Sequence, residues 1–237
     1  MFTIERTTAF FEVFMARRYY EVLWSGLQNT LLLTVIATTI GIAIGLIVAM
    51  VQIAEVKKSD KFAYTILKIA KILAKLYVDI IRGTPVVVQI SFLWLVVLGP
   101  IQIIPRVMVG GIAFGINSGA YMAEVIRGGI QAIDKGQMEA GRSLGMSHSQ
   151  TMKEIILPQA IKQMLPALVN EFIVLIKETA IIGFIGGMDL MKSADIMIGA
   201  TYNYEIPLLM VAIIYLIITS ILTMFMRNIE KRLNKSR

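Results

Sequence analysis

Cysteine is absent from this chain of 237 residues, and histidine occurs once, at His148. These absences exclude disulfide bonds and metal sites built from thiolates or several imidazoles. Charged residues are also scarce, at 16% against about 25% in soluble globular domains. The sequence contains no Walker A pattern (GxxxxGK[ST]) and no HExxH. We therefore expect no catalytic residue, no metal site and no cofactor in this chain.

Much of the sequence consists of long runs without charged residues, and 57% of the residues are hydrophobic. About 20 apolar residues are enough for a helix to cross a bilayer. The runs predict an all-α integral membrane protein with a single transmembrane domain over residues 1–237. Its five spans are expected at about 22–54, 83–99, 107–126, 160–186 and 206–226, with an external turn at Gly99-Pro100 and Pro105 and an external loop over 187–204. In such a protein a net charge of +7 is a signal of membrane topology, and no nucleic-acid partner is expected.

The helix expected over residues 62–81 either rises through the membrane or lies along its cytoplasmic surface. Lys68, Lys71 and Lys75 recur at i, i+3 and i+7, on one face of this helix. Because lysine is costly in lipid, we expect this face to meet water or headgroups. The sequence Arg82-Gly83-Thr84-Pro85 then interrupts the helix, since glycine and proline together break its hydrogen-bond ladder.

Five spans place the two termini on opposite sides of the membrane. Most of the 23 lysine and arginine residues fall in segments that are cytoplasmic when the C-terminus is inside. Because cytoplasmic loops carry an excess of lysine and arginine, we expect the N-terminus outside and the C-terminus in the cytoplasm. The polar segment 134–158 is then cytoplasmic.

Segment 134–158 predicts two short helices separated by a glycine. Asp134 with Gln137, and Ser147 with Gln150, have the spacing of helix-capping residues. Gly145 lies between them, where a left-handed glycine ends a helix. Because the first helix is too small to form a core of its own, we expect a partner to hold it.

Small residues recur every four positions in two of the expected spans. The first stripe comprises Ala37, Gly41, Gly45 and Ala49, and the second comprises Gly111, Gly115, Gly119 and Ala123. Such stripes allow helices to approach closely, so we interpret both as packing surfaces.

Polar side chains within the spans have two interpretations. Glu124, Glu171 or Glu178 could form ion pairs with Lys177 or Arg127 that fix the packing of helices. Alternatively, the acids could line a cavity and accept the ammonium group of a substrate. Neutral hydrogen bonds would then come from Asn117, Ser118 and the interrupted backbone at Gly83-Thr84.

Segment 134–158 also carries a family pattern, EAA-x3-G-x9-I-x-L-P. Here it reads Glu139-Ala140-Gly141, then Gly145, Ile155 and Leu157-Pro158. The chain therefore resembles permease subunits of binding-protein-dependent ABC importers. One position departs from the pattern, because Gly141 replaces the third alanine.

Three further stretches resemble the branch of this family that takes up polar amino acids. They are Arg82-Gly83-Thr84-Pro85 with Gln89, Asn117-Ser118-Gly119-Ala120-Tyr121 with Glu124 and Arg127-Gly128-Gly129, and Lys177-Glu178-Thr179. Together with the polar residues of the spans, they give the candidate substrate-binding residues Thr84, Gln89, Asn117, Ser118, Tyr121, Glu124, Glu171 and Glu178.

The resemblance implies the five-helix fold of a type I ABC importer permease in the cytoplasmic (inner) membrane of a bacterium. It implies a second permease subunit, identical or different, an external solute-binding protein, and two cytoplasmic ATPase subunits that bind ATP and Mg²⁺. Segment 134–158 is then the coupling segment, which docks on the ATPase and switches the cavity between inward-facing and outward-facing states. The residues implied in this contact are Glu139, Ala140, Gly141, Leu144 and Gly145.

The expected function is the ATP-driven import of polar amino acids, with basic ones (arginine, lysine or histidine) favoured by the acids in the spans. Glutamine, glutamate or another small polar solute is the alternative substrate. An intramembrane enzyme would need a nucleophile–base pair or a metal site within the membrane. The sequence contains no HExxH, and its one GxSxG match, residues 141–145, lies in the polar segment 134–158 outside the expected spans. A passive channel would have no use for a cytoplasmic docking helix.

Overall fold

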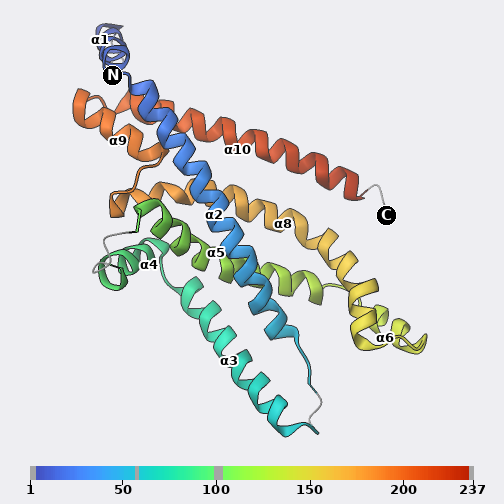
Figure 1. Ribbon diagram of the computed structural model, residues 1–237. Helices are drawn as coiled ribbons and strands as arrows, with labels where there is room; N and C mark the ends of the chain where they lie inside the picture. The colour runs from blue at the N-terminus through green and yellow to red at the C-terminus, as the bar shows by residue number, and fades with distance from the viewer. Residues whose placement is uncertain (1–3, 57–58, 99–103, 235–237) are drawn as a thin grey trace. The chain divides into compact units, whose positions relative to one another are not determined.

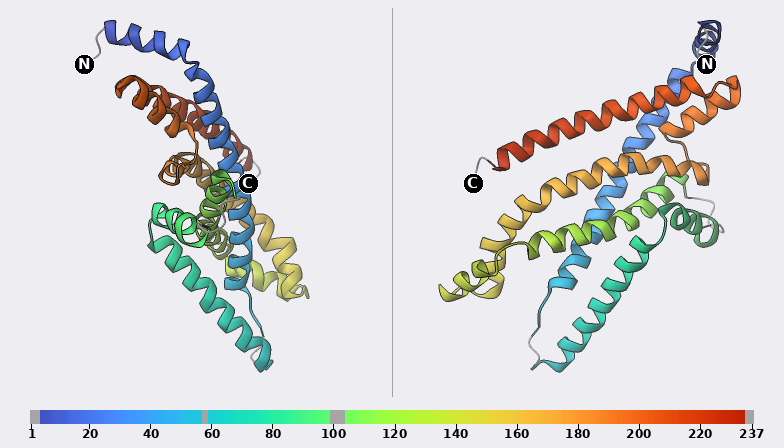
Figure 2. Two further views of the ribbon diagram at one scale, coloured as in Figure 1. Left: turned by 60° about the vertical axis from the view of Figure 1, so that its left-hand side comes forward. Right: turned by 180° about the vertical axis from the view of Figure 1, so that it is seen from behind.

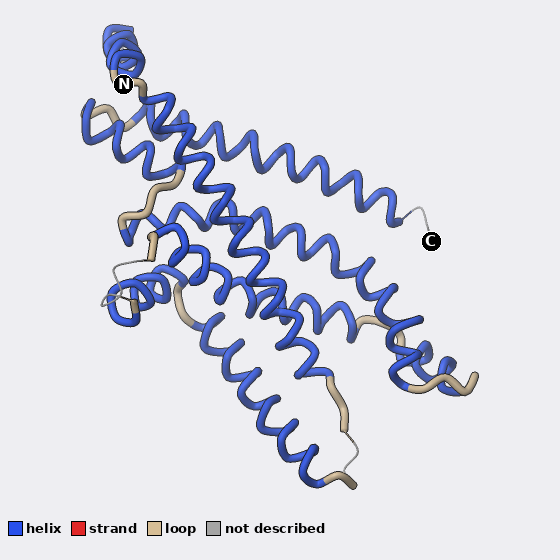
Figure 3. Tube along the Cα trace, in the orientation of Figure 1, coloured by secondary structure: helices blue, strands red, loops and turns tan. Residues whose placement is uncertain are grey.

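The computed structural model describes residues 4–56, 59–98 and 104–234, which form only helices and the loops between them (Figure 3). The chain divides into two compact units, and each draws on segments that are distant in the sequence. The long helices α2 (Tyr19–Ile53), α5 (Arg106–Gln131), α8 (Leu157–Glu178) and α10 (Glu205–Asn234) contribute to both units. Their course can be followed in Figure 1.

The first unit comprises Met1–Ala37, Val86–Phe114 and Ile173–Phe225. It contains α1 (Ile4–Ala16), α4 (Val86–Phe92), the π-helix η1 (Leu93–Val97), the 3₁₀-helix η3 (Thr179–Ile185) and α9 (Leu190–Thr201). Phe10 and Phe14 of α1 pack with Leu190 and Met197 of α9 in a buried cluster. The region between α8 and α10, expected as an external loop over 187–204, therefore contains a helix.

Buried hydrogen bonds explain why α9 begins at Leu190. The Asp189 carboxylate is fully buried and accepts hydrogen bonds from the backbone N–H groups of Met191 at 3.0 Å and Lys192 at 2.9 Å. The N–H of Leu190 donates to the Thr30 hydroxyl of α2 at 3.0 Å. Three otherwise orphaned N–H groups of the first turn are thus satisfied, and α9 is fixed to α2.

The second unit comprises Thr38–Pro85, Gly115–Phe172 and Met226–Arg237. In it, the small-residue stripes of α2 and α5 pack against each other, as the sequence predicted. A Cβ atom at Gly45 would lie 2.8 Å from the Met122 Cβ, and one at Gly119 would lie 2.9 Å from the Ile44 Cβ. Distances this short leave no room for a side chain, so glycine is required for the approach of the two helices.

The region 62–99 contains the helix and the interruption that the sequence predicted, and the helices after the interruption are short. Helix α3 (Lys61–Gly83) is continuous over 23 residues, a length of about 34 Å at 1.5 Å per residue. The chain then bends sharply at Thr84 and Pro85. The seven residues of α4 and the five of η1 extend only about 18 Å, less than the roughly 30 Å of a hydrocarbon core. The expected turn at Gly99-Pro100 lies outside the described residues.

Length and composition identify the helices that could cross a membrane among the described residues. Helices α2 and α10 are each long and apolar enough, and α3 with the helices after its bend gives a third, broken candidate. The remaining long helices, α5 with 26 residues and α8 with 22, carry the polar side chains that the sequence placed within the membrane.

Segment 134–158 has the expected helix–glycine–helix form. Asp134 caps α6 (Lys135–Ser143) by accepting a hydrogen bond from the N–H of Gly136. Gly145 follows α6 with a left-handed φ of 83°, and Ser147 and Gln150 form the predicted capping box at the start of α7 (His148–Thr151). A π-helix, η2 (Met152–Ile156), leads into α8. Helix α6 and the α7–η2 segment fold as a hairpin, the yellow-green part of Figure 2.

Candidate functional site

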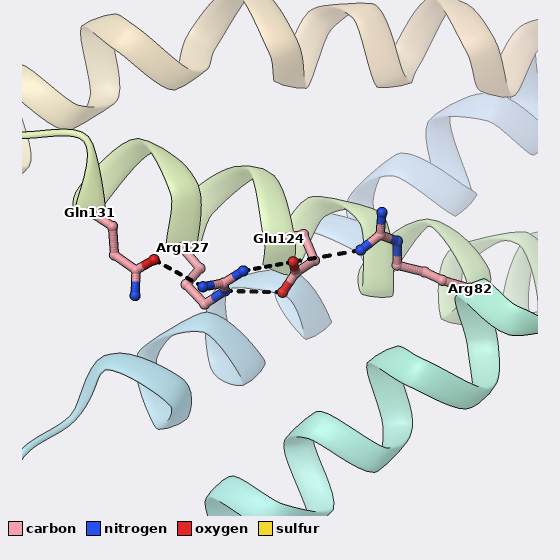
Figure 4. A network of polar contacts seen from close by, with 4 residues as sticks. All are labelled: Arg82, Glu124, Arg127 and Gln131. Atoms are coloured by element: carbon pink, nitrogen blue, oxygen red, sulfur yellow. Dashed lines mark hydrogen bonds and ion pairs between the residues drawn. The ribbon is translucent and has the colours of Figure 1, made fainter.

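The charged centre of the second unit is Arg82, in the last turn of α3. A cation is favourable there because the carbonyl groups at a helix C-terminus carry partial negative charge. The Thr84 hydroxyl donates to the carbonyl oxygen of Ile80 at 2.9 Å and closes the same turn. The sequence Arg82-Gly83-Thr84-Pro85 thus ends α3 and leaves the Arg82 side chain directed at α5 (Figure 4).

On α5, Glu124 and Arg127 face Arg82 from one turn of helix. The Nε and Nη2 atoms of Arg127 donate to the two Glu124 carboxylate oxygens at 3.0 and 2.8 Å, a bidentate geometry that strengthens such a pair. The Nη1 atom of Arg82 lies 3.5 Å from the same carboxylate. Gln131 extends the network by accepting from the Arg127 Nη1 at 2.9 Å. Glu124 therefore holds two arginines from two helices (Figure 4).

Two tyrosines complete the contact between α3 and α5. The Arg82 guanidinium carbon lies 5.3 Å from the centre of the Tyr121 ring, within the range of a cation–π interaction. Tyr77 precedes Arg82 on α3 by more than one turn, and its hydroxyl donates to the carbonyl oxygen of Ile116 of α5 at 2.5 Å. These contacts fix the position of Arg82 relative to α5.

Glu171 is the second acid near Arg82. It lies on α8, is half-buried, and is acted on by the positive charge of Arg82. Glu124 pairs with Arg127 within α5, so this pair does not itself join two helices, and the contact of Glu124 with another helix is made with Arg82. Glu171 makes no direct ion pair with any part of the chain that the structure describes. The two acids therefore differ: the Glu124 carboxylate is occupied, and the Glu171 carboxylate is available.

A hollow of about 380 Å³ adjoins the network, within the roughly 300–1,000 Å³ typical of sites for small ligands. Its charged lining carries more cations than anions, and the residues are Lys71, Lys75, Asp79, Arg82, Glu124 and Arg127. The hollow therefore favours a ligand with at least one anionic group. Within the described residues, no group of three or more potential metal-binding His, Asp or Glu side chains occurs.

The structure brings some of the candidate substrate-binding residues together and separates others. Tyr121 and Glu124 contact Arg82, Thr84 lies in the adjoining turn, and Glu171 lies within range of the Arg82 charge. Ser118 is buried, and its hydroxyl lies against Gly41 of α2; its neighbour Asn117 is also buried. Gln89 and Glu178 belong to the other unit.

Sequence reasoning missed Arg82, Lys71, Lys75, Asp79 and Gln131 as members of this cluster. Arg82 could have been predicted as a site residue from the sequence. It lies directly before the interruption at Gly83-Thr84-Pro85, where a long charged side chain can extend past the end of its helix.

Segment 134–158 has a close contact inside its hairpin, between Gly141 and Thr151. Gly141 of α6 is buried, and a Cβ atom there would lie 2.5 Å from the Thr151 Cγ2 and 2.8 Å from its Oγ1. This contact explains the glycine at the position where the family pattern has alanine. Leu144 is 81% exposed, a large apolar side chain with no cover from its own chain. The other residues of the expected docking contact, Glu139, Ala140 and Gly145, are also exposed.

Replacing Glu124 by glutamine is expected to lower both stability and transport. Arg82 and Arg127 would lose their shared carboxylate and repel each other beside Lys71 and Lys75. Because the pair is partly exposed, we expect a cost of about 1–2 kcal/mol in unfolding free energy, measured by titration with a denaturing detergent. Gln131→Ala is the control, since it removes one neutral acceptor. A Glu124→Gln protein as stable as this control would contradict the role of the network.

Helices of membrane-spanning length, a charged hollow among them and an exposed helical hairpin define a membrane transport subunit. Residues 62–235 match the family described as the binding-protein-dependent transport system inner membrane component, and the chain belongs to this family. It is 48% identical to GlnP of Rickettsia bellii, named for a glutamine transport system, over 69% of this chain and 75% of that protein. It is 42% identical to the arginine transport system permease protein ArtQ of Bacillus subtilis, over 69% of this chain and 75% of that one.

Solved structures confirm the fold. The crystal structure of an amino acid ABC transporter with histidines superposes with a TM-score of 0.81 at 42% identity, over 92% of this chain and 97% of that one. An inward-facing structure of the MetNI methionine ABC transporter superposes with a TM-score of 0.73 at 18% identity, over 90% of this chain and 96% of that one, and supports the fold alone. The chain is thus an amino-acid ABC transporter permease of the type I importer fold, and it is a transport subunit rather than an enzyme.

Proposed function

We propose that this permease imports polar amino acids and prefers basic ones. The observation that carries the preference is the half-buried Glu171 carboxylate, which has no direct ion pair among the described residues while Glu124 is held by two arginines. Arg82 can bind the α-carboxylate of a substrate, and Glu171 can bind a cationic side chain or the α-ammonium group. Relatives named for arginine transport and for glutamine transport are both compatible with recognition of the amino-acid backbone at Arg82.

Replacing Glu171 by glutamine tests this preference. In proteoliposomes that also contain the ATPase and receive the binding protein, the variant is expected to lower arginine uptake at least tenfold. A tenfold loss is about 1.4 kcal/mol, close to the lower end of the range for a hydrogen bond to a charged group. Glutamine uptake is expected to change much less, since glutamine presents no side-chain cation.

The control is Glu12→Gln, which removes an exposed acid of α1 in the other unit. Equal loss of arginine and glutamine uptake in Glu171→Gln would assign Glu171 to packing or to the α-ammonium group. Wild-type uptake that favours glutamine over arginine would establish the alternative substrate.

The membrane arrangement follows from the helix lengths and the charge distribution. The five crossing helices are α2, α3, α5, α8 and α10, with the N-terminus outside and the C-terminus in the cytoplasm. Helix α3 takes the place of the expected span 83–99, because its length of about 34 Å suffices to cross, whereas α4 and η1 together do not. The coupling hairpin then faces the cytoplasm.

The partners follow from membership of a binding-protein-dependent transport family. An external solute-binding protein delivers the amino acid, a second permease copy or homologue completes the pathway, and two ATPase subunits bind ATP and Mg²⁺. The hairpin docks on the ATPase through the exposed residues Glu139, Ala140, Leu144 and Gly145. Gly141 contributes by packing under Thr151. Only a difference in affinity of the ATPase for two states of the permease can drive the switch between them.

A further inference from the structure

Three lysines of α3 line a second hollow next to the charged site. The hollow measures about 520 Å³, and its lining includes Lys68, Lys71 and Lys75 but only one acid, Glu55. Lys71 and Lys75 also line the hollow around Arg82, so the two are adjacent. None of the three lysines forms an ion pair within residues 4–56, 59–98 and 104–234. Three cationic groups therefore share this hollow with a single acid, and none of them is paired with it within the described residues.

The lysines occupy the seam between two different faces of α3. At 100° per residue, they fall within about 60° of one another. On one side of this stripe lie the buried residues Ala74 and Val78, which face the protein. On the other side the helix exposes large apolar side chains, namely Ile66, Ile69, Ile72, Leu73, Leu76 and Ile80. A ligand at the stripe thus meets positive charge and an apolar surface together.

The hollow also has a defined position along the chain. Ala54, Glu55 and Val56, which immediately follow the end of α2, form part of its wall. In the proposed topology this loop is cytoplasmic, so the hollow opens at the inner surface of the membrane. Lys68 and Lys71 lie within about 15 Å of the cytoplasmic start of α3, and lysine side chains there lie along apolar surface with their ammonium groups turned toward headgroups and water.

We propose that this hollow binds an anionic phospholipid of the inner leaflet, with its phosphate at Lys68, Lys71 and Lys75 and its acyl chains along the apolar face of α3. The charge selects an anionic headgroup, because each lysine near an anionic membrane surface contributes about fivefold in affinity. The apolar face favours a lipid over a free phosphate ion, because a phosphate ion has no acyl chain to pack against it. The inference rests on the proposed topology and is independent of the substrate of the transporter.

The test uses the purified full-length chain, in detergent, mixed with phosphatidylglycerol or phosphatidylcholine and analysed by native mass spectrometry. Phosphatidylglycerol is expected to be retained in excess over phosphatidylcholine, and less so at high salt because exposed charges are screened. In the triple variant Lys68→Gln, Lys71→Gln and Lys75→Gln, the affinity of the protein for phosphatidylglycerol is expected to fall about 100-fold. A triple lysine-to-arginine variant keeps the charge and is expected to retain the lipid.

A matched control neutralises three exposed lysines outside the hollow, Lys61, Lys153 and Lys162, and is expected to bind as the unmodified chain does. Equal retention of the two lipids by the unmodified chain would overturn the proposal without any variant. An unchanged affinity for phosphatidylglycerol in the triple glutamine variant would also overturn the proposal. Displacement of the lipid by millimolar inorganic phosphate would overturn it as well. A shift between monomer and dimer in that variant with lipid retention unchanged would assign the surface to a second copy of the chain.

The assay contains neither ATP nor amino acid, so its failure leaves the proposed transport function untouched. Conversely, loss of arginine selectivity in Glu171→Gln is expected to leave lipid retention unchanged.

Discussion

Alanine at Gly129 is expected to destabilise the protein by about 1–3 kcal/mol, whereas alanine at the neighbouring Gly128 is expected to stabilise it slightly. Both glycines lie near the C-terminal end of α5. A Cβ atom at Gly129 would lie 2.8 Å from the Met164 Cβ of α8, while one at Gly128 would meet nothing within 4 Å. Overpacking of a well-filled contact costs about 1–3 kcal/mol. At an open helical position, alanine gains about 0.5–1 kcal/mol over glycine.

The contact at Gly129 matters because it joins the two helices that flank the coupling hairpin. Ile126 and Ile130 of α5 and Ala160 and Met164 of α8 form one buried cluster on either side of it. The extra methyl group cannot be accommodated by a flexible side-chain tip, since the neighbouring atom is the Met164 Cβ, which is fixed to the backbone of α8. The helices must therefore move apart, and the cluster loses contacts along its length.

Unfolding by titration with a denaturing detergent, followed by circular dichroism, measures both variants against the unmodified chain. Opposite signs for the two adjacent substitutions are the expected result. Equal effects at Gly128 and Gly129 would show that helix propensity, and not packing against α8, controls this part of α5.

Alanine at Gly141 is expected to loosen the coupling hairpin, and a second substitution at Thr151 is expected to restore it. The added Cβ would clash with the Thr151 side chain, and we expect a local cost of about 1–3 kcal/mol. Thr151→Ala removes both clashing atoms, at the cost of the hydrogen bond from its hydroxyl to the Ser147 carbonyl oxygen at 3.0 Å. A net hydrogen bond contributes about 1 kcal/mol. The double variant is therefore expected to resemble Thr151→Ala alone.

Amide hydrogen exchange across residues 135–156 measures this local stability, and amino-acid uptake with the ATPase present measures its consequence for coupling. The two single variants and the double variant form a thermodynamic cycle. For residues in contact, an interaction energy of about 0.5–3 kcal/mol is expected. Additive effects would contradict the contact and would leave the glycine at this position without a structural reason.

Local signals in the sequence were sufficient for several elements. Gly145 ends α6 and the Ser147–Gln150 capping box starts α7, because both signals act through hydrogen bonds between residues three to five positions apart. The small-residue stripes predicted packing correctly for the same reason: a period of four residues places them on one helix face. Periodicity could not tell which helix supplies the partner face, and here the stripe of α2 meets that of α5.

Two strong signals in the sequence competed over residues 62–99 and left the organisation of this region open. In 62–99, the lysines argued against a crossing helix and the uncharged residues after Pro85 argued for one. The structure has a continuous α3 and only short helices after the bend, because the helical hydrogen-bond ladder ends at the glycine and proline whatever the hydropathy of the residues beyond. The loop expected at 187–204 contains α9, whose start depends on Thr30, a residue 160 positions away.

Membership of the transporter family could be predicted from the sequence alone, because the EAA segment and the uncharged runs are patterns of residue order and spacing along the chain. The contacts of Arg82 with Glu124 and Tyr121, and the availability of Glu171, required the tertiary structure. Glu124 and Arg127 are three residues apart on one helix, a spacing that itself allows an ion pair. Charges on different helices, such as Arg82 and Glu124, pair according to distances in space that their spacing along the chain does not indicate. The same holds for Gly141. Alanine is excluded there because folding places the Thr151 side chain against this position.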